Sequence, residues 1–211
     1  MTENWHQTLK NKNREELIAA GKELFMKQSF LNVNIKDVCG RAGVSRVTFY
    51  KHFQSMDELI FEVQMELLES MTEFVQRQAA AGALNGKEQL RSMLDAWIDF
   101  AGQHPGYIKF ILLFDLHYEA YESNQELKER YERFIDERKE QHFLGEALEA
   151  GKKDGSLNPD LDALETAQFI FTSMMGLLQK LSLTPMNQWG LIPKRFAEML
   201  MQHVSAAPAS G

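Results

Sequence analysis

Cysteine is almost missing from the sequence, which contains only Cys39 among its 211 residues. A single cysteine cannot form a disulfide within the chain, and no charged segment followed by an apolar stretch opens the sequence. The longest nearly uncharged apolar runs, around residues 107–116 and 167–178, are shorter than the roughly 20 residues that cross a bilayer. We therefore expect a protein of the reducing cytoplasm with no membrane-spanning segment.

Motifs that mark common enzymes and metal sites are missing as well. The sequence has no H-E-x-x-H and no glycine-rich phosphate loop. The Glu-x-x-His spacing of di-iron helical bundles occurs only at Glu3 and His6, in a segment that we expect to be a loose N-terminal tail. Cys39 falls among apolar residues at helical spacing, which favours a core position over a nucleophile. We predict that the protein is not an enzyme and that it uses no cofactor or metal ion.

The positive net charge expected of a general nucleic-acid binder is also absent, since the net charge is −7. The charge is unevenly distributed, however. Residues 1–58 contain 9 Lys and Arg and 7 Asp and Glu, a balance of +2, and the remainder carries −9. This division fits a small module that faces anions, joined to an acidic body that phosphate would repel.

Apolar residues alternate with polar ones almost nowhere, so half-buried β-strands are not expected. They recur instead at intervals of three and four residues, and 44% hydrophobic content is ample for a core. The pattern predicts an all-α chain of about nine helices. Two precede a tight turn at Gly43 and a short one follows it; the later ones are expected over 56–79, 87–103, 105–121, 125–151, 161–183 and 193–204.

Three residues separate the second helical pattern from the third, which indicates a helix-turn-helix joint. Gly43 can adopt the left-handed conformation that ends a helix, and Ser45 can cap the next helix. Asn34 can cap the second helix in the same way. Ser55 begins an S-x-x-E capping box, from which a long helix starts at about Met56.

The short helix after Ser45 has two distinct sides. At about 100° per residue from Arg46, Phe49 and Phe53 fall on one side, which we expect to be buried. Val47, Thr48 and Lys51 point away from it, and Tyr50 lies at the border. An outer arc with a hydroxyl, a cation and a small apolar group suits the major groove of DNA, although any helical hairpin has a polar outer face.

Residues 17–25 (LIAAGKELF), 34–53 (NIKDVCGRAGVSRVTFYKHF) and the SMDEL that follows resemble the N-terminal DNA-binding domain of the tetracycline-repressor (TetR) family of bacterial transcriptional regulators. The resemblance covers roughly residues 10–65. It implies that Thr48 and Tyr50 bind backbone phosphates, while other residues lie over bases or flank the site. The candidate DNA-binding residues are Lys36, Ser45, Arg46, Val47, Thr48, Tyr50, Lys51 and His52.

Two positions depart from the family pattern. The family often has glycine where Val47 stands, and lysine where Met56 stands. Valine can contact a thymine methyl, so we expect an operator that differs from those of relatives. Met56 removes a phosphate contact, which lowers the expected affinity and makes its salt dependence shallower.

The resemblance implies a homodimeric, ligand-responsive regulator of transcription, a repressor rather than an activator, that binds a palindromic operator. We expect residues 1–58 to form the DNA-binding domain, 59–205 the ligand-binding and dimerisation domain, and 206–211 a disordered tail. The helix over 56–79 would join the domains, and a ligand would tilt it and change the spacing of the two reading helices.

Two sets of residues are candidates for the partner surfaces of the second domain. The ligand set, an aromatic-rich group that suits an apolar or aromatic effector, is Trp97, Phe100, Tyr107, Phe110, Phe114, His117, Tyr118, Tyr121, Met174 and Met175. The dimer set, at helical spacing in the last two expected helices, is Leu164, Gln168, Phe171, Met175, Leu178, Phe196, Met199, Leu200 and His203. Each set can also be read as intramolecular core.

Membership of the family would not by itself prove DNA binding. Because of Val47 and Met56, a relative that has lost DNA binding and acts through protein contacts remains the alternative.

Overall fold

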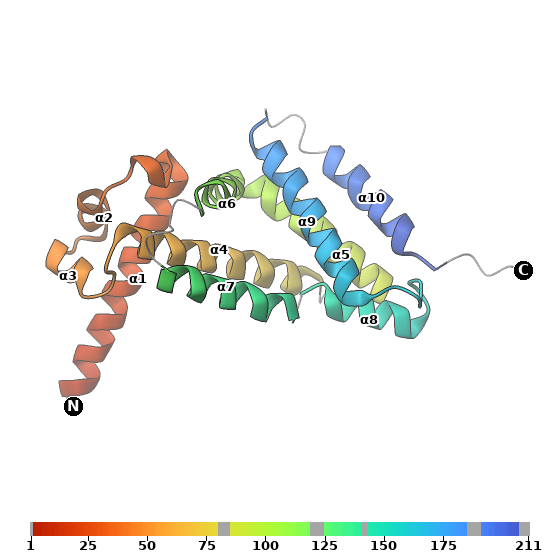
Figure 1. The fold of residues 1–211 in the computed structure, drawn as a ribbon, viewed down its shortest axis with the longest axis horizontal. Helices are drawn as coiled ribbons and strands as arrows, with labels where there is room; N and C mark the ends of the chain where they lie inside the picture. The colour runs from red at the N-terminus through yellow and green to blue at the C-terminus, as the bar shows by residue number, and fades with distance from the viewer. Residues whose placement is uncertain (1, 80–84, 119–124, 141–142, 185–190, 207–211) are drawn as a thin grey trace, which may run out of the picture. The chain divides into compact units, whose positions relative to one another are not determined.

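The computed structural model describes residues 2–79, 85–118, 125–140, 143–184 and 191–206, and these residues form helices without any β-strand. The all-α prediction is therefore confirmed. Ten α-helices and one 3₁₀-helix are described (Figure 1): α1 Thr2–Gln28, η1 Phe30–Asn32, α2 Ile35–Ala42, α3 Arg46–Tyr50, α4 Met56–Ala79, α5 Gly86–Gln103, α6 Pro105–His117, α7 Gln125–Glu140, α8 Gly145–Asp154, α9 Ala163–Ser182 and α10 Ile192–Val204. No described helix is long and apolar enough to cross a membrane.

Two expectations about helix boundaries are wrong. The single helix expected over 125–151 is two helices, α7 and α8. The sequence does not reveal the interruption between them, because the helical spacing of apolar residues continues through Leu144 and Leu148. The segment around Glu3 is not a loose tail, since α1 begins at Thr2. The expected tail over 206–211 lies outside the described residues except for Ala206.

The chain forms two compact units. Unit 1 comprises residues 1–67 and 109–131, and unit 2 comprises residues 68–108 and 132–211. Three helices, α4, α6 and α7, therefore contribute residues to each unit.

Unit 1 is built around the first three helices. Leu17 and Phe25 of α1, Val38 of α2 and Phe49 of α3 are buried together with Leu59 of α4. Phe110, on α6, stacks on Phe25 with ring centroids 5.8 Å apart. The three N-terminal helices therefore share their hydrophobic core with part of α6, although residues 51–104 lie between α3 and α6 in sequence.

Unit 2 is a helical layer in which α5 packs against α8 and α10, and α9 packs against α8 and α10. The approach of α5 to α8 is close because two glycines meet there: a Cβ at Gly86 would overlap the backbone N of Gly151. Asp154, at the end of α8, secures this contact by accepting a hydrogen bond from Gly86 N at 2.7 Å. The same carboxylate accepts a hydrogen bond from Ser156 N at 2.9 Å. The hydrogen bond from the Ser156 hydroxyl has the largest effect on the pKa of Asp154, and together with the two backbone hydrogen bonds it lowers that pKa.

Candidate DNA-binding and ligand-binding sites

The turn between α2 and α3 has the geometry that the sequence predicts. Gly43 ends α2 in the left-handed conformation, with φ of 69°. Its N–H and that of Val44 both point to Cys39 O, the latter at 3.0 Å. At the other end of α2, Asn34 and Asp37 form a reciprocal capping box. Both ends of α2 are thus closed by local hydrogen bonds, which holds α3 at a defined angle.

Ser45 caps α3, as predicted. Its Oγ accepts a hydrogen bond from Thr48 N at 3.1 Å and lies 2.9 Å from Thr48 Oγ1. The last turn extends beyond the five residues of α3, because Phe53 N donates to Phe49 O at 2.9 Å. Because its hydroxyl lies within hydrogen-bonding distance of Ser45 Oγ, Thr48 has a fixed side-chain position in the absence of DNA.

The two sides of α3 are also as predicted. Phe49 and Phe53 are buried, with ring centroids 5.6 Å apart. Val47 is 69% exposed and Tyr50 57% exposed, and the Tyr50 ring meets the edge of Phe49 at 5.5 Å. The remaining candidates divide in the same way: Lys36, Ser45, Arg46 and Lys51 are exposed, and Thr48 and His52 are partly buried.

Three cations on this surface are available for anions. Lys36, Arg46 and Lys51 form no ion pair with any residue in the described part of the chain. By contrast, Arg41 on the last turn of α2 is paired with Glu23 at 2.5 Å, and this pairing lowers the pKa of the Glu23 carboxyl. The outer face of α3 therefore presents free positive charge and hydroxyls at the same place.

A second set of charged contacts secures the junction between α3 and α4. Ser55 Oγ accepts from Glu58 N at 3.1 Å, and the Glu58 carboxylate accepts from Gln54 N at 2.6 Å. Arg130 of α7 pairs with Glu58 at 3.8 Å and with Glu62. Sequence reasoning missed Arg130, because nothing in the local pattern of α7 indicates which residues of α4 it faces.

Glu62 continues this network into α1. It pairs with Arg14 at 2.6 Å, and the Arg14 guanidinium also lies 5.4 Å from the centroid of the Phe53 ring. The N-terminal half of α4 is therefore connected by charged side chains to α1 on one side and to α7 on the other.

The structure does not gather the predicted ligand set in one place. In unit 1, Phe110 and His117 pack on Phe30 at 5.3 and 5.9 Å, so they belong to the core beside α1. Also in unit 1, Phe114 and Tyr118 contact each other at 6.0 Å. In unit 2 lie Trp97, Phe100, Tyr107, Met174 and Met175, and Tyr121 lies outside the described residues.

Phe114 and Tyr118 belong to a cluster that sequence reasoning found only in part. Their rings contact those of Phe61 on α4 and Tyr131 on α7, and all six pairs of ring centroids are 5.0–6.2 Å apart. We call these four residues the aromatic cluster of unit 1. The contribution of Phe61 and Tyr131 could not be read from the sequence, because three separate helices meet there.

Gln64 lies beside this cluster and is fully buried. Its Nε2 donates a hydrogen bond to Tyr131 Oη at 3.2 Å, whereas its Oε1 accepts none among the described residues. Burial, as the largest effect, raises the pKa of the Tyr131 hydroxyl far above its usual value. The sequence offered one signal that was overlooked, namely a glutamine within the apolar face of α4.

Unit 2 contains a second buried polar side-chain atom, on Trp97, without a partner in the described part of the chain. Trp97 stacks on Phe171 with centroids 5.3 Å apart and meets the edge of Phe143 at 5.7 Å. Its Nε1 donates no hydrogen bond within the described residues. A separate group forms around Phe100, whose ring lies 5.3 Å from Phe74 and 5.9 Å from Tyr107.

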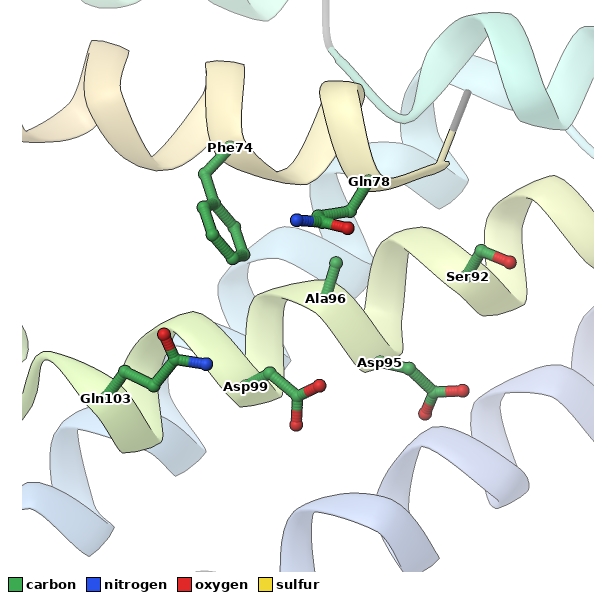
Figure 2. A pocket seen from close by; sticks show the side chains of 7 residues that line it. All are labelled: Phe74, Gln78, Ser92, Asp95, Ala96, Asp99 and Gln103. Atoms are coloured by element: carbon green, nitrogen blue, oxygen red, sulfur yellow. The ribbon is translucent and has the colours of Figure 1, made fainter. Parts of the chain in front are cut away.

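A groove of about 340 Å³ lies between the C-terminal part of α4 and α5 in unit 2. Figure 2 shows Phe74 and Gln78 reaching from α4 toward α5, while Asp95 and Asp99 project from α5. Ser92, Ala96 and Gln103 complete the lining, and Asp95 is paired with Arg91 at 3.0 Å. None of the predicted ligand residues lines this groove, and its polar lining differs from the apolar pocket that the sequence predicts.

The predicted dimer set lies on α9 and α10 of unit 2, with mixed exposure. Leu164 is 45% exposed and Met199 61% exposed; Gln168 and His203 are also exposed. Phe171 and Phe196 are half-buried, and Met175, Leu178 and Leu200 are buried within the chain. The exposed members, together with Phe169, which sequence reasoning missed, leave apolar surface on both helices.

The capped α3, its glycine turn and its outward cations define a helix-turn-helix of the class that regulators of transcription place on DNA. Residues 17–63 match the model of the bacterial regulatory proteins of the tetR family, and residues 86–188 match that of the tetracyclin repressor-like C-terminal domain. Since these matches together span well over half of the chain, the protein belongs to the TetR family.

Solved structures agree with this assignment at the level of the fold. The ketosteroid transcriptional regulator KstR2 of Mycobacterium tuberculosis is 17% identical, with a TM-score of 0.61 over 92% of this chain and 95% of that one. The transcriptional regulator FadR from Bacillus subtilis, in complex with stearoyl-CoA, is 17% identical, with a TM-score of 0.65 over 92% and 99%. A TetR family transcription regulator from Marinobacter aquaeolei VT8 is 15% identical, with a TM-score of 0.64 over 95% and 100%. The family and these neighbours are regulators of transcription and not enzymes.

Proposed function

We propose that the protein is a cytoplasmic, ligand-responsive repressor that binds a palindromic operator as a homodimer. Residues 1–58 form the DNA-binding domain, residues 59–205 the ligand-binding and dimerisation domain, and α4 links the two. The observation that carries this proposal is the outer face of α3, where Arg46 and Lys51 are exposed beside the capped Thr48 and the exposed Tyr50. Neither cation has an acidic partner in the part of the chain that the structure describes.

Physical chemistry assigns distinct tasks to these side chains. The hydroxyls of Thr48 and Tyr50 can donate to phosphate oxygens, which sets the position of α3 on the duplex. Arg46 can donate two hydrogen bonds to one guanine, and Val47 can contact a thymine methyl. Lys36 and Lys51 add charge at the edges of the contact, which favours binding near phosphate.

Dimerisation supplies the specificity that one short helix lacks. Two copies of α3 that contact half-sites about 34–36 Å apart read twice as many base pairs as one copy. The exposed apolar residues of α9 and α10, including Leu164 and Met199, support an interface there. A small apolar or aromatic effector then shifts operator affinity by binding one of two conformations better than the other. FadR from Bacillus subtilis, which has a similar fold, has been solved in complex with stearoyl-CoA, and this supports an effector with apolar surface.

Fluorescence anisotropy with labelled duplex from upstream of the protein's own gene, at two salt concentrations, tests DNA binding. The variant that combines Thr48→Val with Tyr50→Phe removes both hydroxyls and nearly preserves the side-chain shapes. We expect it to bind at least about tenfold more weakly, because hydrogen bonds to charged acceptors are among the stronger ones. Circular dichroism provides the control for folding.

Two results would contradict the proposal. Equal affinity of the variant and the natural protein would remove α3 from the DNA interface. If the natural protein caused no change in anisotropy at either salt concentration, the alternative would be favoured, namely a family member that acts through protein contacts.

A further inference from the structure

The side-chain oxygen of Gln64, which has no partner among the described residues, indicates where a ligand would be recognised. Its side chain is fully buried, and its Oε1 accepts no hydrogen bond from the described residues. Folded proteins leave few buried acceptors unsatisfied, because an unpaired buried acceptor loses its hydrogen bonds to water without replacement. A ligand that donates a hydrogen bond to Oε1 would recover this loss.

The surroundings of Gln64 limit the chemistry of such a ligand. Next to it lie four aromatic rings whose centroids are 5.0–6.2 Å apart, those of Phe61, Phe114, Tyr118 and Tyr131. Burial raises the pKa of the Tyr131 hydroxyl, so the environment disfavours charge. Aromatic faces and edges favour another planar ring at similar distances.

We propose that the aromatic cluster of unit 1 binds a neutral aromatic effector that donates one hydrogen bond to Gln64 Oε1. The inference rests on the proposed function, since it names the class of effector for that regulator. Gln64 and the cluster lie within the same compact unit as the helix-turn-helix.

A ring must move for the effector to reach Gln64, because the four rings already contact one another. Phe61 and Phe114 are fully buried between α4 and α6. Tyr118 is only half-buried, and the Lys128 ammonium lies 5.1 Å from its ring centroid. The effector therefore replaces the Tyr118 ring in the cluster and packs against the other three.

The same turn of α7 gives this site a mechanical link to α3. Tyr131 accepts the hydrogen bond from Gln64, and the neighbouring Arg130 pairs with Glu58 and Glu62 of α4. Glu58 also accepts from Gln54 N at 2.6 Å, just beyond α3. An effector that packs against Tyr131 and shifts this turn of α7 also draws Arg130 away from α4, and the junction between α3 and α4 loses a support.

Indole and 1-methylindole form a matched pair of probes, because both are neutral two-ring molecules and only indole has an N–H donor. Calorimetric titration of the full chain is expected to show indole binding about tenfold more tightly than 1-methylindole, the usual worth of one buried hydrogen bond. Indole-2-carboxylate, which carries a charge, is expected to bind more weakly than either.

Two variants locate the effect. Gln64→Met keeps the length of the side chain and removes its amide, so indole affinity is expected to fall about tenfold while that of 1-methylindole changes little. Trp97→Phe removes Nε1, the second buried side-chain atom that has no partner among the described residues. It lies in unit 2, and the variant is expected to leave the preference for indole intact. Thermal unfolding of each variant verifies that it is folded.

Three outcomes would overturn the inference: no binding of indole by the folded natural protein, equal binding of indole and 1-methylindole, or loss of the preference in Trp97→Phe but not in Gln64→Met. These titrations contain no DNA. A failure to bind indole would therefore not contradict operator binding, which the anisotropy assay measures separately. In the operator assay, indole is expected to lower DNA affinity of the natural protein and not that of Gln64→Met.

Discussion

At the scale of single residues, the two exposed cations of α3 differ in what they can recognise. The guanidinium of Arg46 has two parallel donors that match one guanine, whereas the ammonium of Lys51 acts as a point charge near phosphate. Neither is paired with an acid in the described structure. Their removal should therefore affect DNA binding in different ways.

Arg46→Ala is expected to weaken operator binding by about 1–3 kcal/mol and to relax the preference at one base pair of each half-site. Lys51→Ala is expected to weaken binding to all duplexes alike and to reduce the slope of log affinity against log salt by about one for each phosphate that is no longer neutralised. Anisotropy titrations with single-base operator variants at several salt concentrations distinguish the two. Identical specificity profiles for Arg46→Ala and the natural protein would exclude base reading by Arg46.

Asp154 is expected to make stability depend on pH in the acid range. Hydrogen bonds from Ser156 and Gly86 lower the pKa of its carboxyl in the folded state below the ordinary value of 3.8. An acid of this kind stabilises the fold above its unfolded pKa, and the contribution disappears as pH falls through the lower, folded pKa. Asp154→Asn should therefore lower the urea midpoint at pH 7, and the difference should shrink below about pH 4.

Asp160→Asn is the matched control for that experiment. Asp160 is exposed in the next loop, and its carboxylate has no partner among the described residues. Its urea midpoint should follow that of the natural protein at every pH. A constant difference between Asp154→Asn and the natural protein from pH 7 to pH 3 would contradict the assignment.

At the scale of elements, the contact between α5 and α8 depends on the absence of side chains. A Cβ at Gly86 would overlap the backbone of Gly151 and lie 2.7 Å from Ala147 O. Gly86→Ala is expected to force the helices apart and to lower the free energy of unfolding by about 1–3 kcal/mol or more. Gly102→Ala, on the same helix with nothing within 4 Å, should change it by no more than about 1 kcal/mol, in the stabilising direction. Chemical unfolding of both variants measures the contrast, and equal midpoints would disprove this packing argument.

The elements also show where sequence patterns are sufficient. The ends of α2, α3 and α4 were predictable because a few neighbouring residues close them: Gly43 in the left-handed conformation, and Ser45 and Ser55 as caps. The interruption between α7 and α8 was not predictable, because the apolar spacing continues through it. Only the structure shows that Arg130 and Tyr131 of α7 contact α4 and α6, whereas α8 packs against α5 and α9.

At the scale of the whole molecule, assembly should depend on the exposed apolar residues of α9 and α10. Leu164→Glu combined with Met199→Glu places charge where the proposed interface would be dry, so dimers are expected to dissociate and operator affinity to fall. Both residues are exposed, so the single chain should stay folded. Sedimentation or light scattering gives the mass.

Leu116→Glu is the control for the dimer experiment, since Leu116 is 68% exposed but belongs to unit 1, whereas α9 and α10 belong to unit 2. Its mass should equal that of the natural protein. An unchanged mass in the double variant would place the interface elsewhere. Several residues of the predicted dimer set, such as Leu178, are already buried in the core of the single chain.

The sequence alone determined the all-α fold, the helix-turn-helix and the outer face of α3, because each depends on residues a few positions apart: helical spacing, a glycine turn and a capping serine. Tertiary structure alone decided which aromatic residues meet. It placed Phe61 and Tyr131 beside Phe114 and placed Gln64 beside Tyr131, and it left one amide atom of Gln64 without a partner among the described residues. Helical periodicity reports that a side chain is buried, but the neighbour that it meets depends on how distant helices pack, which no local pattern contains.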